Sequence, residues 1–304
     1  MNSGLIKEYL SCERDYDYDV VCGSVKGDYP SYFKLPDECT GTQKDQGHVG
    51  ACVAETITSI AEAWWNRSLG VKDEHSEGFT YGAFRHDDSD EVGLYVSTAL
   101  SKWKDIGTMP KKYFDILVEM PEMKSIVESH PEFLDIAKNY KLTAYSRLRD
   151  TGRSARDQQV KDAITKYNYG LVSVFGHHCV QLVGWDDSKD VYIYKDSYGS
   201  DSGDNGYKTK RKDAFSEIWL PIFERVDMPF EDVSEDDWFH DAIRRLYFSG
   251  MINGRTDVKM CPNDYITRAE VFALLDRHIS KDDEDKKILN RVINDKLSLS
   301  REEG

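Results

Sequence analysis

The stretch KDQGHVGACVAETITSIAEAWW, residues 44–65, decides the fold because it places a cysteine between a glycine-containing loop and an amphipathic segment. Its apolar residues, among them Val53, Ile57, Ile60 and Trp64, recur at helical spacing, which predicts a buried helix over residues 51–65. Cys52 then lies at the helix N-terminus, where the helix dipole lowers the pKa of a thiol. This position favours a reactive cysteine, although a cysteine at a helix start is more often a small core residue.

Two histidines and an aspartate further along the chain are candidate partners of this thiol. His177 and His178 open the predicted strand HHCVQLVGW, and Asp196 ends the next strand in KDSYG. An imidazole beside a thiol accepts its proton, and a carboxylate beside that imidazole fixes its orientation. We therefore take Cys52, His178 and Asp196 as a candidate catalytic set. Each residue alone also fits a structural role, as a core thiol, a strand-start residue and a turn residue.

Composition excludes several classes of protein. The chain has 304 residues, enough for one large and one small domain, and 39% of them are hydrophobic, which is typical of folded proteins. A net charge of -15 repels nucleic-acid phosphates and anionic membranes, so we expect no nucleic-acid partner. No apolar run is long enough to cross a bilayer, so we expect no membrane span. Acidic residues stand where a signal peptide would need an apolar core, so none is visible at the start of this sequence.

Cysteine spacing predicts no metal site. The six cysteines form no CxxC pair and no cluster with histidine at zinc-ligand spacing: Cys12, Cys22, Cys39, Cys52, Cys179 and Cys261. We therefore expect no metal and no other cofactor. The even number permits disulfides, for example among Cys12, Cys22 and Cys39, whereas reduced thiols are the alternative in a chain of this size.

Periodicity and breaker residues outline the domains. Helices are predicted over residues 94–107, 121–141 with an interruption at Pro131, and 157–168; strands are predicted over 169–175, 179–186 and 190–196. The predicted domains are an N-terminal arm or short pro-segment (1–35), a main domain (36–226), a small helical domain (227–280) and a charged tail (281–304).

Three blocks, in order, resemble the papain family of cysteine peptidases. KDQGHVGACVAE resembles the nucleophile loop of that family, in which DQG is followed three residues later by [SA]-C-W-A. HHCVQLVGWDD resembles its H-A-V-x-x-V-G-Y strand, and YIYKDSYGSDSGDNGY resembles W-x-x-x-N-S-W-G followed by G-x-x-G-Y. The resemblance implies an α+β fold with a helical subdomain and an antiparallel β subdomain, with the cysteine facing the histidine across the cleft between them.

The resemblance also implies a role for each matching residue. Cys52 would be the nucleophile, His178 the general base and acid, and Asp196 the residue that orients the imidazole. Gln46 and the N–H of Cys52 would stabilise the oxyanion. His177 would be a solvent-facing neighbour.

Gly93, Tyr198 and Val53 are the implied substrate-binding positions, and here the chain departs from the family. Val53 replaces the tryptophan after the nucleophile, and Tyr198 replaces the tryptophan that shields the third catalytic residue. That third residue, an asparagine in the family, is Asp196. GLVSVFGHHCV also leads almost directly into the catalytic strand, where the family carries a longer substrate-binding loop, so we expect a more open site.

A different family resemblance covers residues 230–277. FEDVSEDDWFHDAIRRLYFSGMINGRTDVKMCPNDYITRAEVFALLDR resembles one S-layer homology (SLH) repeat, an all-α module. The resemblance implies binding of cell-wall polysaccharide through Trp238, Gly254 and Arg268. Arg255 and Val258 depart from the usual loop of such repeats. Because SLH repeats normally build modules of three, a homotrimer through this domain is a further hypothesis.

Together these patterns predict a cysteine-type endopeptidase with a Cys-His-Asp triad, acting on peptide or protein substrates at a bacterial cell surface. One alternative is a hydrolase or amidase of peptidoglycan stem peptides in a cell-wall or phage lysis system. The other is a catalytically weak structural component of a surface layer or phage particle. Location stays open between the cell surface and a phage particle, and the sequence does not indicate side-chain preference.

Overall fold

The computed structural model describes most of the chain. The described ranges are 16–17, 27–69, 72–85, 92–148, 153–223, 228–234, 236–248 and 252–276. Most of the predicted N-terminal arm, the charged tail, Cys12 and Cys22 lie outside them. The chain divides into two compact units, the first made of Met1–Trp64, Glu74–Lys111 and Asp115–Glu224. The second consists of Arg225–Gly304 with the short segments Trp65–Asp73 and Lys112–Phe114.

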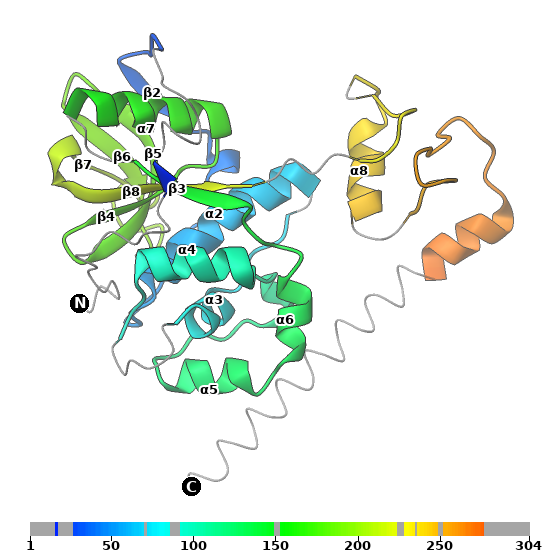
Figure 1. Ribbon diagram of the computed structural model, residues 1–304, viewed down its shortest axis with the longest axis horizontal. Helices are drawn as coiled ribbons and strands as arrows, with labels where there is room; N and C mark the ends of the chain where they lie inside the picture. Colours follow the sequence, from blue (N-terminus) through cyan, green and yellow to red (C-terminus); the bar gives the residue numbers. More distant parts are fainter. Residues whose placement is uncertain are drawn as a thin grey trace, which may run out of the picture. The chain divides into compact units, whose positions relative to one another are not determined.

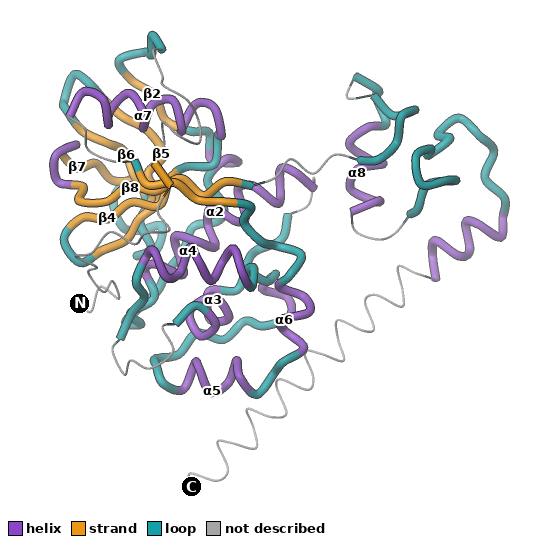
Figure 2. Tube along the Cα trace, viewed as in Figure 1, coloured by secondary structure: helices purple, strands orange, loops and turns teal. Residues whose placement is uncertain are grey.

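Most helices of the first unit gather on one side, whereas the strands and one further helix, over residues 153–167, lie on the other (Figure 1, Figure 2). The helical side contains α2 (Cys52–Leu69), α3 (Glu77–Ala83), α4 (Val96–Asp105), α5 (Glu122–Glu128) and α6 (Glu132–Ala137). Pro131 separates α5 from α6, because proline lacks the N–H that a continuous helix would need. The helices predicted over 51–65 and 94–107 and the interruption at Pro131 are therefore confirmed.

A single mixed sheet forms the other side of this unit. Its strands are β1 (Tyr16–Asp17), β2 (Tyr32–Lys34), β3 (Ala144–Arg147), β4 (Leu171–Phe175), β5 (His178–Asp186), β6 (Val191–Lys195), β7 (Tyr207–Arg211) and β8 (Phe215–Ile222). The order is β1-β3-β8-β4-β5-β6-β7, with β2 paired to β5. Only the β1–β3 pair is parallel among the described strands. The α+β fold expected from the sequence is confirmed.

Strand β5 lies at the centre of the core. All nine of its residues are buried, and α7 (Arg153–Tyr167) packs against it. The core also contains three tryptophans that are each at most 1% exposed: Trp103 of α4, Trp185 of β5 and Trp219 of β8. Burying a large apolar side chain stabilises a fold by about 1.5–3 kcal/mol, so these residues fix the position of β5 in the core.

A tight hairpin fixes the start of β5. Only Gly176 and His177 separate β4 from β5, and Phe175 pairs with His178 across the turn. Gly176 has a φ of 59°, a left-handed conformation that glycine adopts without strain. His177 is exposed at the turn, as expected, whereas His178 is the first buried residue of the strand.

The second unit is helical in its described part. It contains α8 (His240–Phe248) and a helix over residues 268–276. Thr267 caps the latter: its hydroxyl accepts a hydrogen bond from the Glu270 N–H at 3.2 Å, while the Glu270 carboxylate accepts from the Thr267 N–H at 2.7 Å. This reciprocal capping box explains the TRAE letters of the motif. Asp232 accepts hydrogen bonds from the N–H groups of Met260 and Cys261 and so ties the motif's first segment to the central loop.

Candidate active site

Backbone hydrogen bonds join the loop before Cys52 to the loop after β6. The N–H of Gln46 donates to the Ser197 carbonyl at 2.9 Å, and the N–H of Gly199 donates to the Lys44 carbonyl at 2.9 Å. Asp45 and Tyr198 form a β-bridge between these bonds. Residues about 150 positions apart in the sequence are therefore held side by side.

His178 and Asp196 form a buried pair. The Nε2 of His178 lies 2.7 Å from Oδ1 of Asp196, and the same oxygen accepts a hydrogen bond from the Ser197 N–H at 2.9 Å. The other carboxylate oxygen, Oδ2, accepts a hydrogen bond from the Lys208 ammonium at 2.7 Å. Nδ1 of His178 is buried and has no hydrogen-bond partner within the described part of the chain. This nitrogen is therefore available to exchange a proton.

The electrostatic setting keeps Asp196 ionised. Burial raises the pKa of the Asp196 carboxyl. The hydrogen bonds and charges of His178 and Lys208 lower this pKa by more than burial raises it, so the net pKa lies below the usual value. At neutral pH an ionised Asp196 accepts the proton on Nε2 of His178. This bond leaves Nδ1 as the ring nitrogen that gains or loses a proton.

Cys52 is the first residue of α2 and is fully buried. Its sulfur accepts a hydrogen bond from the N–H of Cys179, the residue after His178, so the thiol lies beside the start of β5. Burial nevertheless raises the pKa of the Cys52 thiol well above its usual value. The net pKa is therefore raised rather than lowered as the position at the helix N-terminus had led us to expect, and desolvation by burial is the largest cause. Ionisation of Cys52 requires a base close by.

Tyr198 covers the imidazole of His178. The two rings are stacked, with centroids 5.1 Å apart and planes 12° apart. The pKa of the Tyr198 hydroxyl is raised by burial and by the charges of Asp196 and Cys52. The hydroxyl therefore lies close enough to both groups to interact with them electrostatically. Tyr198 thus stacks on His178 at the position where the resemblance implied a shielding side chain.

Gln46 is clamped beside the nucleophile loop. Its side-chain Nε2 donates to the Val49 carbonyl at 2.8 Å, and its Oε1 accepts from the Ser197 hydroxyl at 2.5 Å. An amide nitrogen carries two hydrogens, so one donor remains for a ligand. Gln46 is 2% exposed, and its orientation is fixed by these bonds.

The three predicted substrate-binding positions differ in their surroundings. The N–H of Gly93 donates to the hydroxyl of Tyr81 at 3.3 Å. The pKa of Tyr81 is raised to about 12, chiefly by burial and the charge of Glu119, with a smaller contribution from Cys52. Val53, in contrast, is fully buried in the core.

A buried charge cluster behind the site was not predicted from the sequence. The Lys44 ammonium bonds to both Glu62 and Glu77 at 2.5 Å. Burial raises the pKa of the Glu55 carboxyl, which lies two turns before Glu62 on the same face of α2, to about 8, and its Oε2 has no partner within the described residues. The signal was present in the sequence, because two glutamates seven residues apart interrupt the apolar face of a helix predicted to be buried.

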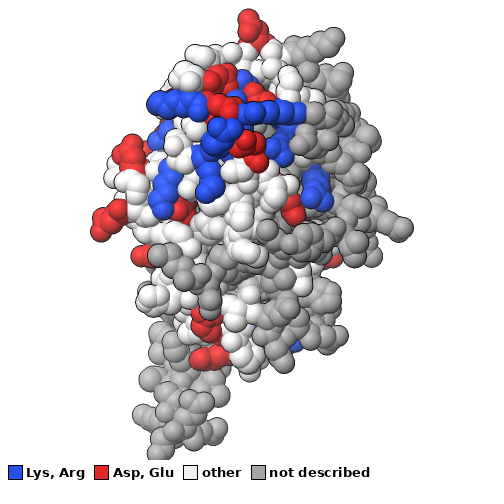
Figure 3. All heavy atoms as spheres, turned by 90° about the vertical axis from the view of Figure 1, so that its left-hand side faces the viewer, with Lys and Arg blue, Asp and Glu red and all other residues white. Residues whose placement is uncertain are grey.

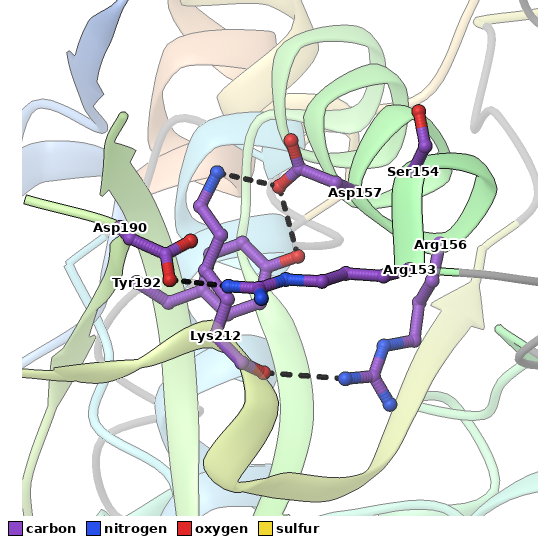
Figure 4. Close-up of a pocket in the computed structure, with 7 residues that line it drawn as sticks. All are labelled: Arg153, Ser154, Arg156, Asp157, Asp190, Tyr192 and Lys212. Atoms are coloured by element: carbon purple, nitrogen blue, oxygen red, sulfur yellow. Dashed lines mark hydrogen bonds and ion pairs between the residues drawn. The ribbon is translucent and has the colours of Figure 1, made fainter. Parts of the chain in front are cut away.

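A separate polar cavity lies at the N-terminus of α7 (Figure 4). Its volume is about 330 Å³. Its charged groups bond to one another: Lys212 to Asp157 at 2.8 Å, Tyr192 to Asp157 at 3.0 Å, and Arg153 to Asp190. Because these side chains already pair with each other through hydrogen bonds and ion pairs, we interpret the cavity as part of the packing between α7 and the sheet.

The second unit contains a groove of about 720 Å³. Trp238 and Gly254, two of the three predicted wall-binding residues, line it together with Arg255 and Glu270. Trp238 is 91% exposed, whereas Arg255 and Glu270 form an ion pair at 2.7 Å. Arg268 is exposed at the start of the last described helix and is not among the lining residues.

The described residues include neither a metal-binding cluster nor a membrane-spanning helix. No group of three or more histidine, cysteine, aspartate or glutamate side chains there could hold a metal ion. No helix among them has the length and apolar character needed to cross a membrane.

Comparison with solved structures identifies the fold of the first unit. Xylellain, a cysteine protease from Xylella fastidiosa, matches with a TM-score of 0.58 and 18% sequence identity, over 74% of this chain and 97% of that protein. The chain has a papain-like fold. The digestive procathepsin L2 proteinase from the larval midgut of Tenebrio molitor matches with a TM-score of 0.56 and 15% identity, over 73% of this chain and 78% of that one.

Sequence comparison identifies the second unit. Residues 229–272 match the S-layer homology domain, which confirms the resemblance inferred from the motif. No curated protein sequence matches the chain. The papain-like fold and the SLH match thus account for separate parts of the chain.

Proposed function

We propose that this chain is a papain-like cysteine peptidase whose SLH domain attaches it to a bacterial cell surface. The bond between Nε2 of His178 and Asp196 carries the proposal, because it leaves Nδ1 without a partner in the described chain, while the N–H of the next residue, Cys179, donates to the Cys52 sulfur. Both similar structures are proteases of this fold, which supports the same reaction class.

In the proposed reaction, Nδ1 of His178 takes the proton of the Cys52 thiol, and the sulfur attacks the carbonyl carbon of the peptide bond. The remaining N–H of Gln46 and the backbone N–H of Cys52 stabilise the oxyanion. The imidazolium then gives its proton to the leaving amine, and the C–N bond breaks to leave a thioester. Water, deprotonated by His178, hydrolyses the thioester and restores the thiol.

Because burial raises the pKa of Cys52, the thiol depends on His178 for ionisation. Ionisation moves a proton over a short distance inside the buried site, so the product is an ion pair rather than an isolated buried charge. Such a pair is less costly than a lone thiolate in the same place. Asp196 contributes by holding the imidazole in the orientation that presents Nδ1.

The SLH domain supports location at a cell surface and a role in assembly. The groove around Trp238 has a mixed aromatic and charged lining, and the SLH match supports a cell-wall polysaccharide as its ligand. Tyr265, Phe272 and Leu275 of the same unit are also exposed. Contact among three copies would cover such side chains, and we propose a homotrimer on this basis. A monomeric mass in light scattering at working concentration would exclude it.

Two other functions remain to be separated from this one by experiment. The SLH match favours a cell-wall substrate as the main alternative, in which the same thiol cleaves peptidoglycan stem peptides. A structural component without activity is the other. We expect the wild-type chain to hydrolyse unfolded casein and Cys52→Ser to have no such activity. Cys261→Ser, which changes a thiol in the other unit, should be as active as the wild type. Activity on purified cell wall alone would favour the first alternative, and no hydrolysis of either substrate would favour the second.

A further inference from the structure

Lys208 contacts the site without being part of the predicted catalytic set. It lies on β7, where Tyr194 is its partner on β6, so it is close to Asp196 at the end of β6. Its ammonium bonds to Oδ2 of Asp196 at 2.7 Å. The same ammonium is 5.6 Å from the centre of the Tyr198 ring, which stacks on His178. Lys208 therefore touches two of the groups that surround the imidazole.

The two oxygens of Asp196 have different partners. Oδ1 accepts hydrogen bonds from His178 and the Ser197 N–H, whereas Oδ2 binds Lys208. The Asp196 side chain is 3% exposed, and that of Lys208 is 31% exposed. A carboxylate buried to this extent needs a counter-charge. Lys208 supplies one that does not depend on the protonation state of His178.

β7 carries a concentration of positive charge in an acidic chain. Lys208, Lys210 and Arg211 all lie on this edge strand, and Lys and Arg side chains gather on the face that it occupies (Figure 3). Only Lys208 of the three bonds to Asp196; Lys210 lies over the Phe175 ring, and Arg211 pairs with Asp213. The contact with Asp196 is thus specific to one of three neighbouring cations.

We propose that Lys208 is a positioning residue that neutralises Asp196, so that the pair presents to His178 an acceptor with nearly the net charge of a neutral amide. This inference rests on the proposed peptidase function. An unpaired carboxylate would stabilise the imidazolium too strongly and make it a weaker acid toward the leaving amine. With Lys208 present, Asp196 still orients the ring while its effect on the imidazole charge is reduced.

Other titratable groups near Asp196 constrain the choice of assay. They are Tyr194 on β6, Tyr198 in the following loop, and Lys44, Glu55 and Lys195 around a small cavity beside Asp196. The pKa of Tyr194 is raised by burial and by Asp196 to about 12, so Tyr194 stays neutral. Burial raises the pKa of Glu55 and lowers that of Lys195, each to about 8, so either could appear in an activity profile. The imidazole of His178 must therefore be observed directly.

The test is NMR titration of His178 in the full chain, with labelled histidine and a Cys52→Ser background that removes coupling to the thiol. Loss of one signal in His178→Gln assigns the resonance. We expect Lys208→Met to raise the pKa of His178 by about one unit and Asp196→Asn to lower it by a similar amount. The double variant should return to within about 0.3 units of the parent, because both charges are gone. Lys208→Arg should keep the parent value.

Lys189→Met is the matched control. Lys189 pairs with Asp186 at 2.9 Å, at the opposite end of β5, so this change removes the same charge from another lysine–aspartate pair of the sheet. It should leave the pKa of His178 unchanged. Lys208→Gln replaces Lys208→Met if the latter does not fold.

Equal shifts in Lys208→Met and Lys189→Met would overturn the proposal, as would no shift in Lys208→Met or a shift that persists in the Asp196→Asn background. Because this titration needs no hydrolysis, its outcome is independent of casein cleavage. A chain that cleaves no peptide but shows the expected cycle refutes the peptidase proposal alone. A chain that cleaves peptide with no shift refutes the role of Lys208 alone.

Discussion

Replacing Glu55 by glutamine should make the protein more stable at alkaline pH. Glu55 is 2% exposed on α2, and its Oε2 has no hydrogen-bond partner within the described residues. Burial, and then the charge of Glu77, raise the pKa of the Glu55 carboxyl from 4.5 to about 8. The carboxyl is therefore protonated in the folded state over a pH range in which it is ionised in the unfolded state.

The sign and size of the effect follow from this difference. A folded-state pKa above the unfolded value means that stability is complete below about pH 4.5 and is lost as the pH rises toward about 8. Each unit of difference corresponds to about 1.4 kcal/mol, so the loss by pH 8.5 is on the order of 5 kcal/mol. Glutamine keeps the shape of the side chain but has no charge. We expect Glu55→Gln to differ from the wild type by less than about 1 kcal/mol at pH 5 and to exceed it by on the order of 5 kcal/mol at pH 8.5.

Urea unfolding followed by tryptophan fluorescence at pH 5, 6.5 and 8.5 measures this difference. Glu62→Gln is the control on the same helix, because the Glu62 carboxylate bonds to Lys44 and to the N–H groups of Thr42 and His75. That variant should be destabilised at all three pH values, since it removes a satisfied charge. Parallel pH profiles for Glu55→Gln and the wild type would refute the assignment of a buried, unpaired carboxyl.

Three further substitutions test the proposed site and the packing of the helices. Gln46→Ala should lower kcat by about 10²–10³-fold with little change in KM, because it removes an oxyanion donor; an unchanged kcat would exclude that role. Tyr198→Ala should lower kcat/KM by about tenfold, since about 0.5–1.5 kcal/mol of stacking is lost and water reaches His178; full activity would contradict a shielding role. Gly78→Ala should lower the Tm markedly, because the added Cβ would lie 1.6 Å from the carbonyl oxygen of Ile116, and an unchanged Tm would be incompatible with this packing.

Elements with regular apolar spacing could be predicted from the sequence. The helix beginning at Cys52 and the strands β4, β5 and β6 were all predicted, because each contributes a continuous apolar face to the core. Strand β7 was not predicted, since its sequence, YKTKR, is polar and charged. It becomes a strand because β6 offers it a row of backbone partners, and as an edge strand it exposes its lysines to water.

The pairing of His178 with Asp196 could be predicted from the sequence, whereas the electrostatics around this pair could not. His178 and Asp196 are 18 positions apart, and their pairing follows from two neighbouring strands, so motif order was sufficient. Two features depend on burial and on distant contacts: the raised pKa of Cys52 and the bond from Lys208 to Asp196. The sequence gives no measure of desolvation, and a lysine on an unpredicted strand could not be assigned to the site.

Reaction of the full chain with an epoxide-type thiol electrophile at mildly acidic pH tests most directly whether His178 activates Cys52. Intact-mass analysis counts the labels, and peptide mapping locates them. We expect a single label at Cys52 in the wild type and its loss in His178→Ala, while Lys189→Met reacts like the wild type. Labelling of Cys52 at the same rate without His178, or labels spread over the other cysteines, would contradict an assembled cysteine–histidine pair.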